Sequence, residues 1–92
     1  MIIGLLTLEF HLEGCTSLKE RRGRLSGLRQ RFGRLPQIAV CEVPGENSRH
    51  ACWQFLAMAH SRPRVEQLLD PITQAAATEV DATLLDVQME WL

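Results

Sequence analysis

The sequence predicts an α+β fold in which two helices cover one face of a four-stranded antiparallel sheet. Three observations predict it: apolar and polar residues alternate at both ends of the chain, apolar residues recur at helical spacing in two segments, and a turn-rich segment separates two further strand-like runs. The expected order of elements is βαββαβ, the ferredoxin-like arrangement. Because 92 residues suffice for one hydrophobic core, we expect residues 1–92 to form a single domain.

The first strand is expected over residues 2–12. Its even positions are apolar or glycine, whereas its odd positions are polar from Thr7 onward. One face of the strand should therefore be buried against the helices. Ile3 and Leu5 should lie on the other face, which carries no helices.

The first helix is expected to begin at Ser17, because Ser17-Leu18-Lys19-Glu20 has the pattern of a capping box. Pro36 ends the helical region. Arg21 falls among the apolar residues of the inner stripe, so we expect it to pass the edge of the core or to pair with a carboxylate from the sheet. The apolar members of the stripe are Leu18, Leu25, Leu28, Phe32 and Leu35.

A hairpin is expected from strands over residues 38–43 and 51–59, joined by the turn-rich residues 44–49. If Val43 faces His50, then Cys41 faces Cys52 and a cross-strand pair of thiols becomes possible. We do not expect a disulfide there, because such bridges are geometrically demanding and the compartment looks reducing.

The second helix is expected over residues 63–77, capped by Ser61 or Arg62. Pro71 lacks the N–H that would bond the carbonyl of Gln67, which predicts a kink or break just before it. The last strand should span residues 83–92. Its apolar face is expected to consist of Leu85, Val87, Met89 and Trp91.

The charge distribution is the strongest functional signal. Residues 17–34 hold seven of the ten basic residues, so residues 1–34 carry a net charge of +4 and residues 35–92 a net charge of −5. One basic helix on an acidic body suggests a localised contact with an anionic partner. The alternative is that this basic face is simply solvated, as many arginine-rich helix faces are.

RNA or the ribosome is the anionic partner that this pattern favours. Phosphate contacts are expected from Lys19, Arg22, Arg24, Arg29, Arg31 and Arg34, and the helix amino terminus at Ser17 would hold one more anion. Arg21 is expected to be structural or a further anion contact. Gly23 and Gly27 add no side chains to the outward face of the helix. Either a ligand approaches the backbone closely there, or the helix simply tolerates the two glycines. An RNA-recognition motif is not expected, because residues 51–57 lack its basic, glycine and aromatic signature.

The chain also resembles the YlxP-like family of small bacterial proteins of uncharacterised function. The resemblance involves the opening and closing strands, Gly14 and the segment Ala39–Val43. Its most specific motif is Ser-Leu-Lys-x-Lys/Arg-Arg. That motif maps onto Ser17, Leu18, Lys19, Arg21 and Arg22. Relatives often carry Asp-x-Trp where this chain has Asn47-Ser48-Arg49. The resemblance implies a ferredoxin-like fold and, since such genes often neighbour translation factors, a tie to ribosomes or RNA; it implies no known activity.

Two other functions compete with RNA binding. The uncovered sheet face, with Ile3 and Leu5, would suit a homodimeric protein-interaction module. An acylphosphatase-like enzyme would need a cradle of backbone amides, an arginine and an asparagine, yet the turn before the first helix is not glycine-rich and Asn47, the one asparagine, lies in a distant hairpin loop. We therefore expect no enzymatic activity.

No cofactor, metal or membrane is expected. His50 and Cys52 could join Cys41 or His60 as metal ligands, but their spacing is nonspecific. Cys15, beside the helix amino terminus, is better explained as structural than as reactive. The amino terminus lacks a basic signal-peptide region, and three cysteines without metal-type spacing fit a reducing compartment, so we expect a cytoplasmic protein.

Overall fold

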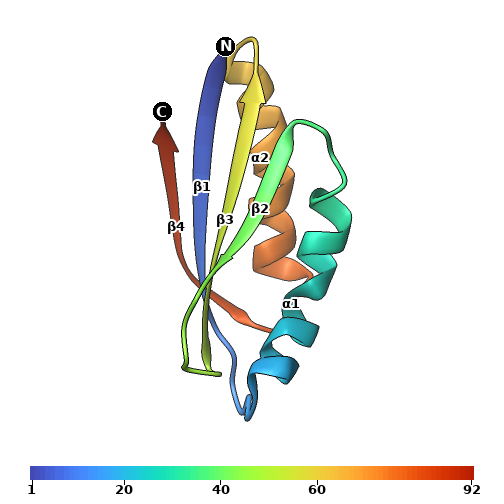
Figure 1. Ribbon diagram of the computed structural model, residues 1–92, viewed down its shortest axis with the longest axis vertical. Helices are drawn as coiled ribbons and strands as arrows, with labels where there is room; N and C mark the ends of the chain where they lie inside the picture. Colours follow the sequence, from blue (N-terminus) through green and yellow to red (C-terminus); the bar gives the residue numbers. More distant parts are fainter.

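The computed structural model describes residues 1–92 and has the predicted ferredoxin-like topology. Its elements are β1 (Ile2–His11), α1 (Leu18–Phe32), β2 (Ile38–Val43), β3 (His50–Ala59), α2 (Arg62–Thr78) and β4 (Thr83–Trp91). The strands form one antiparallel sheet in the order β2-β3-β1-β4. Both helices lie behind this sheet in Figure 1, which leaves its front face uncovered. The predicted fold class is therefore confirmed.

The core lies between the sheet and the helices. The inner faces of the central strands supply its largest side chains, which are Leu6, Leu8, Phe10, Trp53 and Phe55. Gly4 lets α2 approach β1 closely, because a Cβ at this position would lie 2.8 Å from the Cγ1 of Val65. α2 packs on β3, β1 and β4, whereas α1 contacts β2 and α2. The two helices thus divide the sheet between them.

Helix α1 is shorter than the sequence indicated. It ends at Phe32, where Gly33 takes the C-cap position and donates its backbone N–H to the carbonyl of Arg29. Leu35 lies beyond this cap and is exposed, so its assignment to the inner stripe was wrong. Gly33 has φ −70° and ψ −6°, in the right-handed region, so the last turn closes on an ordinary backbone conformation before Pro36 is reached.

The β2–β3 hairpin has a different register from the one considered above. Val43 pairs with Cys52, and Cys41 pairs with Gln54. The register shifts by two residues because the paired residues Val43 and Cys52 enclose residues 44–51, whereas a pair of Val43 and His50 would enclose only residues 44–49. Cys41 and Cys52 are therefore not opposite one another, and both are free thiols.

Helix α2 continues through Pro71 without the expected break. Its inner face is buried on both sides of the proline, at Leu68 and Leu69 before it and Ile72 after it. Proline removes one hydrogen bond, and packing of this apolar face against the sheet compensates for it.

A bulge changes the inner face of β4. Glu9 pairs with Asp86 but Phe10 pairs with Leu84, so Leu85 has no partner on β1. Leu84 packs against the core in its place, and Leu85 is exposed. The assignment of Leu85 to the apolar face was therefore wrong, because one inserted residue reverses the alternation of a strand.

Candidate nucleic-acid interface

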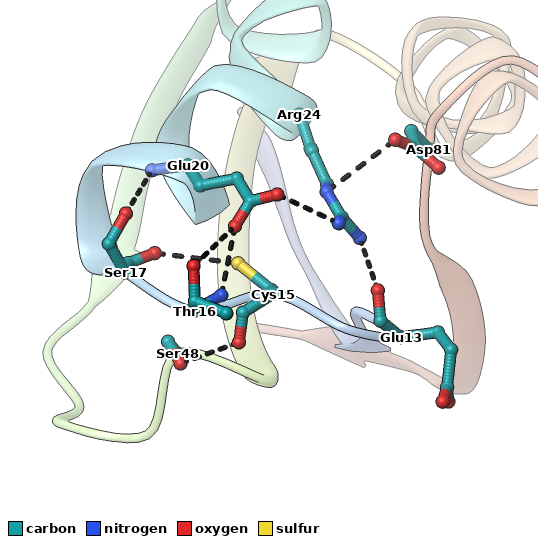
Figure 2. Close-up of polar contacts among 8 residues, drawn as sticks. All are labelled: Glu13, Cys15, Thr16, Ser17, Glu20, Arg24, Ser48 and Asp81. Atoms are coloured by element: carbon teal, nitrogen blue, oxygen red, sulfur yellow. Dashed lines mark hydrogen bonds and ion pairs between the residues drawn. The ribbon is translucent and has the colours of Figure 1, made fainter.

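The amino terminus of α1 is closed by its own side chains (Figure 2). The Ser17 hydroxyl accepts the N–H of Glu20 at 3.1 Å, and the Glu20 carboxylate accepts the N–H of Thr16 at 2.9 Å. The Cys15 thiol donates to the Ser17 carbonyl at 3.4 Å. The Ser17 half of the predicted capping box is thus present, whereas Glu20 reaches the N–H of Thr16, one residue before the cap, instead of the N–H of Ser17. The Ser17 hydroxyl oxygen therefore has a structural role as the cap of the first turn.

Arg24 is held by the same network. Its guanidinium donates to the Glu20 carboxylate at 3.0 Å and to the Glu13 carbonyl at 2.8 Å, and it lies 3.5 Å from the Asp81 carboxylate (Figure 2). The Arg24 side chain is 18% exposed. These contacts tie α1 to the end of β1 and to the segment before β4, so the structure places Arg24 in an internal network and not on the outward basic face.

The charges of this network shift the pKa of both partners. The N–H of Thr16, followed by the guanidinium of Arg24, lowers the pKa of Glu20 below its ordinary value of 4.5. The hydrogen bond to Glu20 in turn raises the pKa of Arg24. The ionised pair is therefore the stable form near neutral pH.

Arg21 is buried to 2% exposure beneath the hairpin loop. Its guanidinium donates to the carbonyls of Gly45, Asn47 and His50 at 3.1 to 3.2 Å and lies 3.6 Å from the Glu42 carboxylate. The expected pairing with a carboxylate from the sheet is thus found, on β2. The loop carbonyls were not foreseen, because carbonyls that converge on one guanidinium leave no mark in a sequence.

Arg21 and two other residues each have one buried polar side-chain atom without a hydrogen-bond partner. Nε of Arg21, Oε2 of Glu42 and Nε1 of Trp53 are buried without a hydrogen-bond partner, and Glu42 is opposite Trp53 in the sheet. Glu42 also lies 3.5 Å from Arg22. Sequence reasoning missed Glu42; the available signal was its position two residues after Val40 on the inner face of β2.

The remaining cations of residues 17–34 divide into paired and free ones. Arg31 donates to Glu79 at 2.6 Å and stacks on Phe32, and Arg22 pairs with Glu42 while remaining 66% exposed. Lys19, Arg29 and Arg34 form no ion pair and no side-chain hydrogen bond. Arg34 lies just beyond the end of α1 and is exposed. The outward basic face consists of Lys19, Arg22, Arg29 and Arg34.

Gly23 and Gly27 lie on the outward side of α1. A Cβ at either position would meet no atom within 4 Å, so nothing in the chain itself requires glycine there. Each glycine costs a helix about 1 kcal/mol relative to alanine. The basic face therefore contains a bare strip of backbone that no intramolecular contact explains.

The geometry also bears on the enzyme and metal alternatives. The hairpin loop is not distant from the turn before α1, since Ser48 donates to the Cys15 carbonyl at 3.0 Å. Nη1 of Arg21 nevertheless donates to three carbonyls of the hairpin, and the Asn47 side chain accepts the N–H of Arg49. No three histidine, cysteine or acidic side chains lie close enough to hold a metal ion. Burial, with a smaller effect of Glu9, raises the pKa of Cys52.

The fold places this chain among ferredoxin-like α+β proteins, and solved structures agree. A de novo designed protein with a ferredoxin fold, determined by solution NMR, has a TM-score of 0.58 at 7% identity over 99% of this chain and 85% of its own. The designed protein Ferredog-Diesel has a TM-score of 0.55 at 10% identity over 96% and 83%. These similarities establish the fold alone.

The chain belongs to the family described as "Protein of unknown function (DUF503)", which matches residues 3–89. No protein of curated function matches the chain. None of the helices combines the length and the apolar character that crossing a bilayer requires.

Proposed function

We propose that this protein is a non-enzymatic, cytoplasmic RNA- or ribosome-binding protein whose contact surface is the outward basic face of α1. The observation that carries the proposal is that Lys19, Arg29 and Arg34 have no acidic partner while the other arginines of α1 do. A cation that is not neutralised within the chain remains available to phosphate.

The shape of the face supports the same partner. At 1.5 Å per residue, Lys19 and Arg29 lie about 15 Å apart along α1, a span over which a nucleic-acid backbone presents several phosphates. Gly23 and Gly27 lie between them without side chains. A phosphate backbone can therefore approach the helix closely, with Lys19 before the two glycines and Arg29 after them along the helix axis.

The resemblance of residues 17–22 to the YlxP-like motif supports the link to translation. The motif residues have two different roles in this chain, because Ser17 and Arg21 hold the fold while Lys19 and Arg22 face outward. The proposed site therefore retains four of the sequence-predicted residues, Lys19, Arg22, Arg29 and Arg34. Ser17, Arg21, Arg24 and Arg31 are assigned to structure.

A salt titration of binding to RNA and to ribosomal subunits tests the proposal. Three or four neutralised phosphates predict that log K falls with log salt at a slope of about −2 to −4. The double variant Arg22→Glu/Arg29→Glu should lose most of this affinity. Arg62→Glu/Arg64→Glu, which changes the net charge equally on α2, serves as the matched control. Equal binding by both variants would discard α1 as the contact.

A second candidate function is homodimerisation through the uncovered face of the sheet. Ile3 pairs with Met58 and Leu5 with Leu56 at one end of this face, and Leu56 and Met58 are 37% and 48% exposed. Such a cluster favours burial against another chain. Light scattering at several concentrations should show a dimer that Met58→Lys disrupts, and a strictly monomeric protein would remove this candidate.

A further inference from the structure

We infer that the free edge of β4 and the groove between β4 and α2 form a second binding site, which takes an extended basic segment of a partner protein as a fifth strand of the sheet. This site lies at the sheet edge next to α2, whereas α1 covers the side of β2 (Figure 1). The inference is therefore independent of RNA binding by α1.

The backbone of β4 offers unpaired groups along this edge. The N–H of Leu92 bonds the carbonyl of Ile3, which places the even residues of β4 in hydrogen-bonded pairs with β1. The N–H and carbonyl groups of Val87, Met89 and Trp91 consequently point away from the sheet. The N–H of Val87 bonds only its neighbouring side chain, the Asp86 carboxylate, at 3.0 Å. A strand added to the edge of the sheet would form its hydrogen bonds with these N–H and carbonyl groups.

Strand β4 lacks some of the usual protections of a sheet edge, although it carries a bulge at Leu85 and the carboxylates Asp86 and Glu90. Its nine residues contain no proline, lysine or arginine. The opposite edge, β2, has six residues and lies between Pro36 and Pro44, with Ile38 on its inner face buried. On β4 the inner-face side chains Val87 and Met89 remain 41% exposed. The inner face of the sheet is therefore less covered at the β4 edge than at the β2 edge.

A groove of about 380 Å³ runs beside this edge. Leu6, Leu69, Val87 and Met89 form its apolar lining, and Glu66 and Asp70 of α2 line its other side. The apolar lining would receive alternate side chains of a strand paired with β4, because every second side chain points to the same face.

The charges around the groove determine which kind of partner strand can bind there. Glu66 and Asp70 border the groove, Asp86 and Glu90 lie on the other face of β4, and none of the four forms an ion pair. The cation nearest the strand's end, Arg62, stacks on the Trp91 ring at 5.0 Å. A second copy of β4 would bring two more carboxylates to this acidic edge, whereas a strand that alternates apolar and basic residues would match both faces.

A peptide of the length of β4 in which lysine and valine alternate is the probe. Its fluorescence anisotropy should report binding that weakens as salt rises from about 50 to about 200 mM, since the contact is partly ionic. A peptide with glutamate in place of lysine should not bind. In amide NMR spectra of the labelled protein, the N–H groups of Val87, Met89 and Trp91 should gain protection from exchange.

Three variants separate the contributions. Glu66→Lys/Asp70→Lys should weaken the peptide by about tenfold, whereas Glu13→Lys/Glu46→Lys, with the same change of net charge, should leave affinity within about twofold. Met89→Pro removes an outward N–H without breaking a bond to β1, so it should retain the fold and lose binding. Any of four results would overturn the inference. The two charge variants could weaken binding equally, or the glutamate peptide could bind as well as the lysine peptide. The gain in protection could be confined to other strands, or Met89→Pro could bind the peptide as well as the wild type. Peptide-independent protection that grows with protein concentration would instead identify a second copy as the occupant.

Discussion

At the scale of single residues, the basic segment of residues 17–34 contains side chains with opposite roles. Arg21 is buried beneath three carbonyls of the hairpin, and Arg24 joins α1 to β1 and to the start of β4. In contrast, no acidic side chain of the protein forms an ion pair with Lys19, Arg29 or Arg34. The sequence indicated the inward position of Arg21 through the helical periodicity. Of the partners of Arg24, Glu20 lies four residues before it on the same helix, but the other two lie 11 residues before it and 57 residues after it and had no local signal.

Replacing Arg21 should be the most destabilising change in the basic segment. Arg21→Met keeps much of the buried volume but leaves three carbonyls and the Glu42 carboxylate without their cationic partner. This loss should lower the free energy of unfolding by about 3–5 kcal/mol. Urea denaturation measures this loss. Arg22→Met is the control, because Arg22 is largely exposed, and it should change stability by less than about 1 kcal/mol. Similar losses in the two variants would contradict a structural role specific to Arg21.

Glu20 should make the stability of the fold depend on acid pH. Its folded pKa lies below the ordinary value of 4.5, so ionised Glu20 stabilises the fold above that value, and this stabilisation is lost as the pH falls through the lowered folded pKa. The difference in unfolding free energy between wild type and Glu20→Gln should therefore be present at pH 6 and disappear on acidification. Denaturant titrations at several pH values measure this difference, and Glu66→Gln, the same substitution at an exposed position without an ion pair, is the matched variant.

At the scale of elements, periodicity predicts which segments form strands and helices but not how they end or pair. The alternation in residues 2–12 corresponds to β1, and the capping box corresponds to the start of α1. The hairpin register and the β4 bulge were not predictable, because each depends on one or two residues of connection length or insertion. Pro71 illustrates the same limit, since tertiary packing maintains α2 across it.

The glycines of α1 provide a test in which stability and binding change in opposite directions. Gly23→Ala/Gly27→Ala should stabilise the fold by about 1–2 kcal/mol, because both Cβ atoms would enter open space and alanine favours helix. If RNA approaches the bare strip, the same variant should bind RNA more weakly. Thermal denaturation and RNA binding assays measure the two effects, and Ser26→Ala on the same helix is the control. Stabilisation with unchanged binding would show that the glycines are merely tolerated.

At the scale of the whole molecule, opposite charges occupy different flanks. The cations of residues 17–34 that have no acidic partner lie on and just after α1, and four carboxylates without an ion pair, Glu66, Asp70, Asp86 and Glu90, lie on α2 and β4. The net charge of −1 is therefore the sum of a basic and an acidic surface. Such a separation permits simultaneous contact with a polyanion and with a basic protein segment.

Simultaneous binding is the corresponding prediction. RNA saturating the basic face should leave the affinity for the lysine–valine peptide within about threefold, because the two proposed sites share no residue. Titration of labelled peptide into the protein with and without an excess of RNA measures the coupling, after peptide binding to RNA alone has been subtracted. Mutually exclusive binding would show that the two partners compete for one surface.

The sequence by itself determined the order of elements, the inner faces of β1, α1 and α2, and the uneven distribution of charge. These properties are local: alternation, helical spacing, a capping box and a count of charges within a segment are each contained in a few consecutive residues. Tertiary structure decided which arginines are neutralised, how β2 pairs with β3, and that the β4 edge stays open beside an acidic groove. Each of these depends on residues that are far apart in the chain, such as Arg24 with Asp81 or Glu66 with Met89, and only folding brings them together.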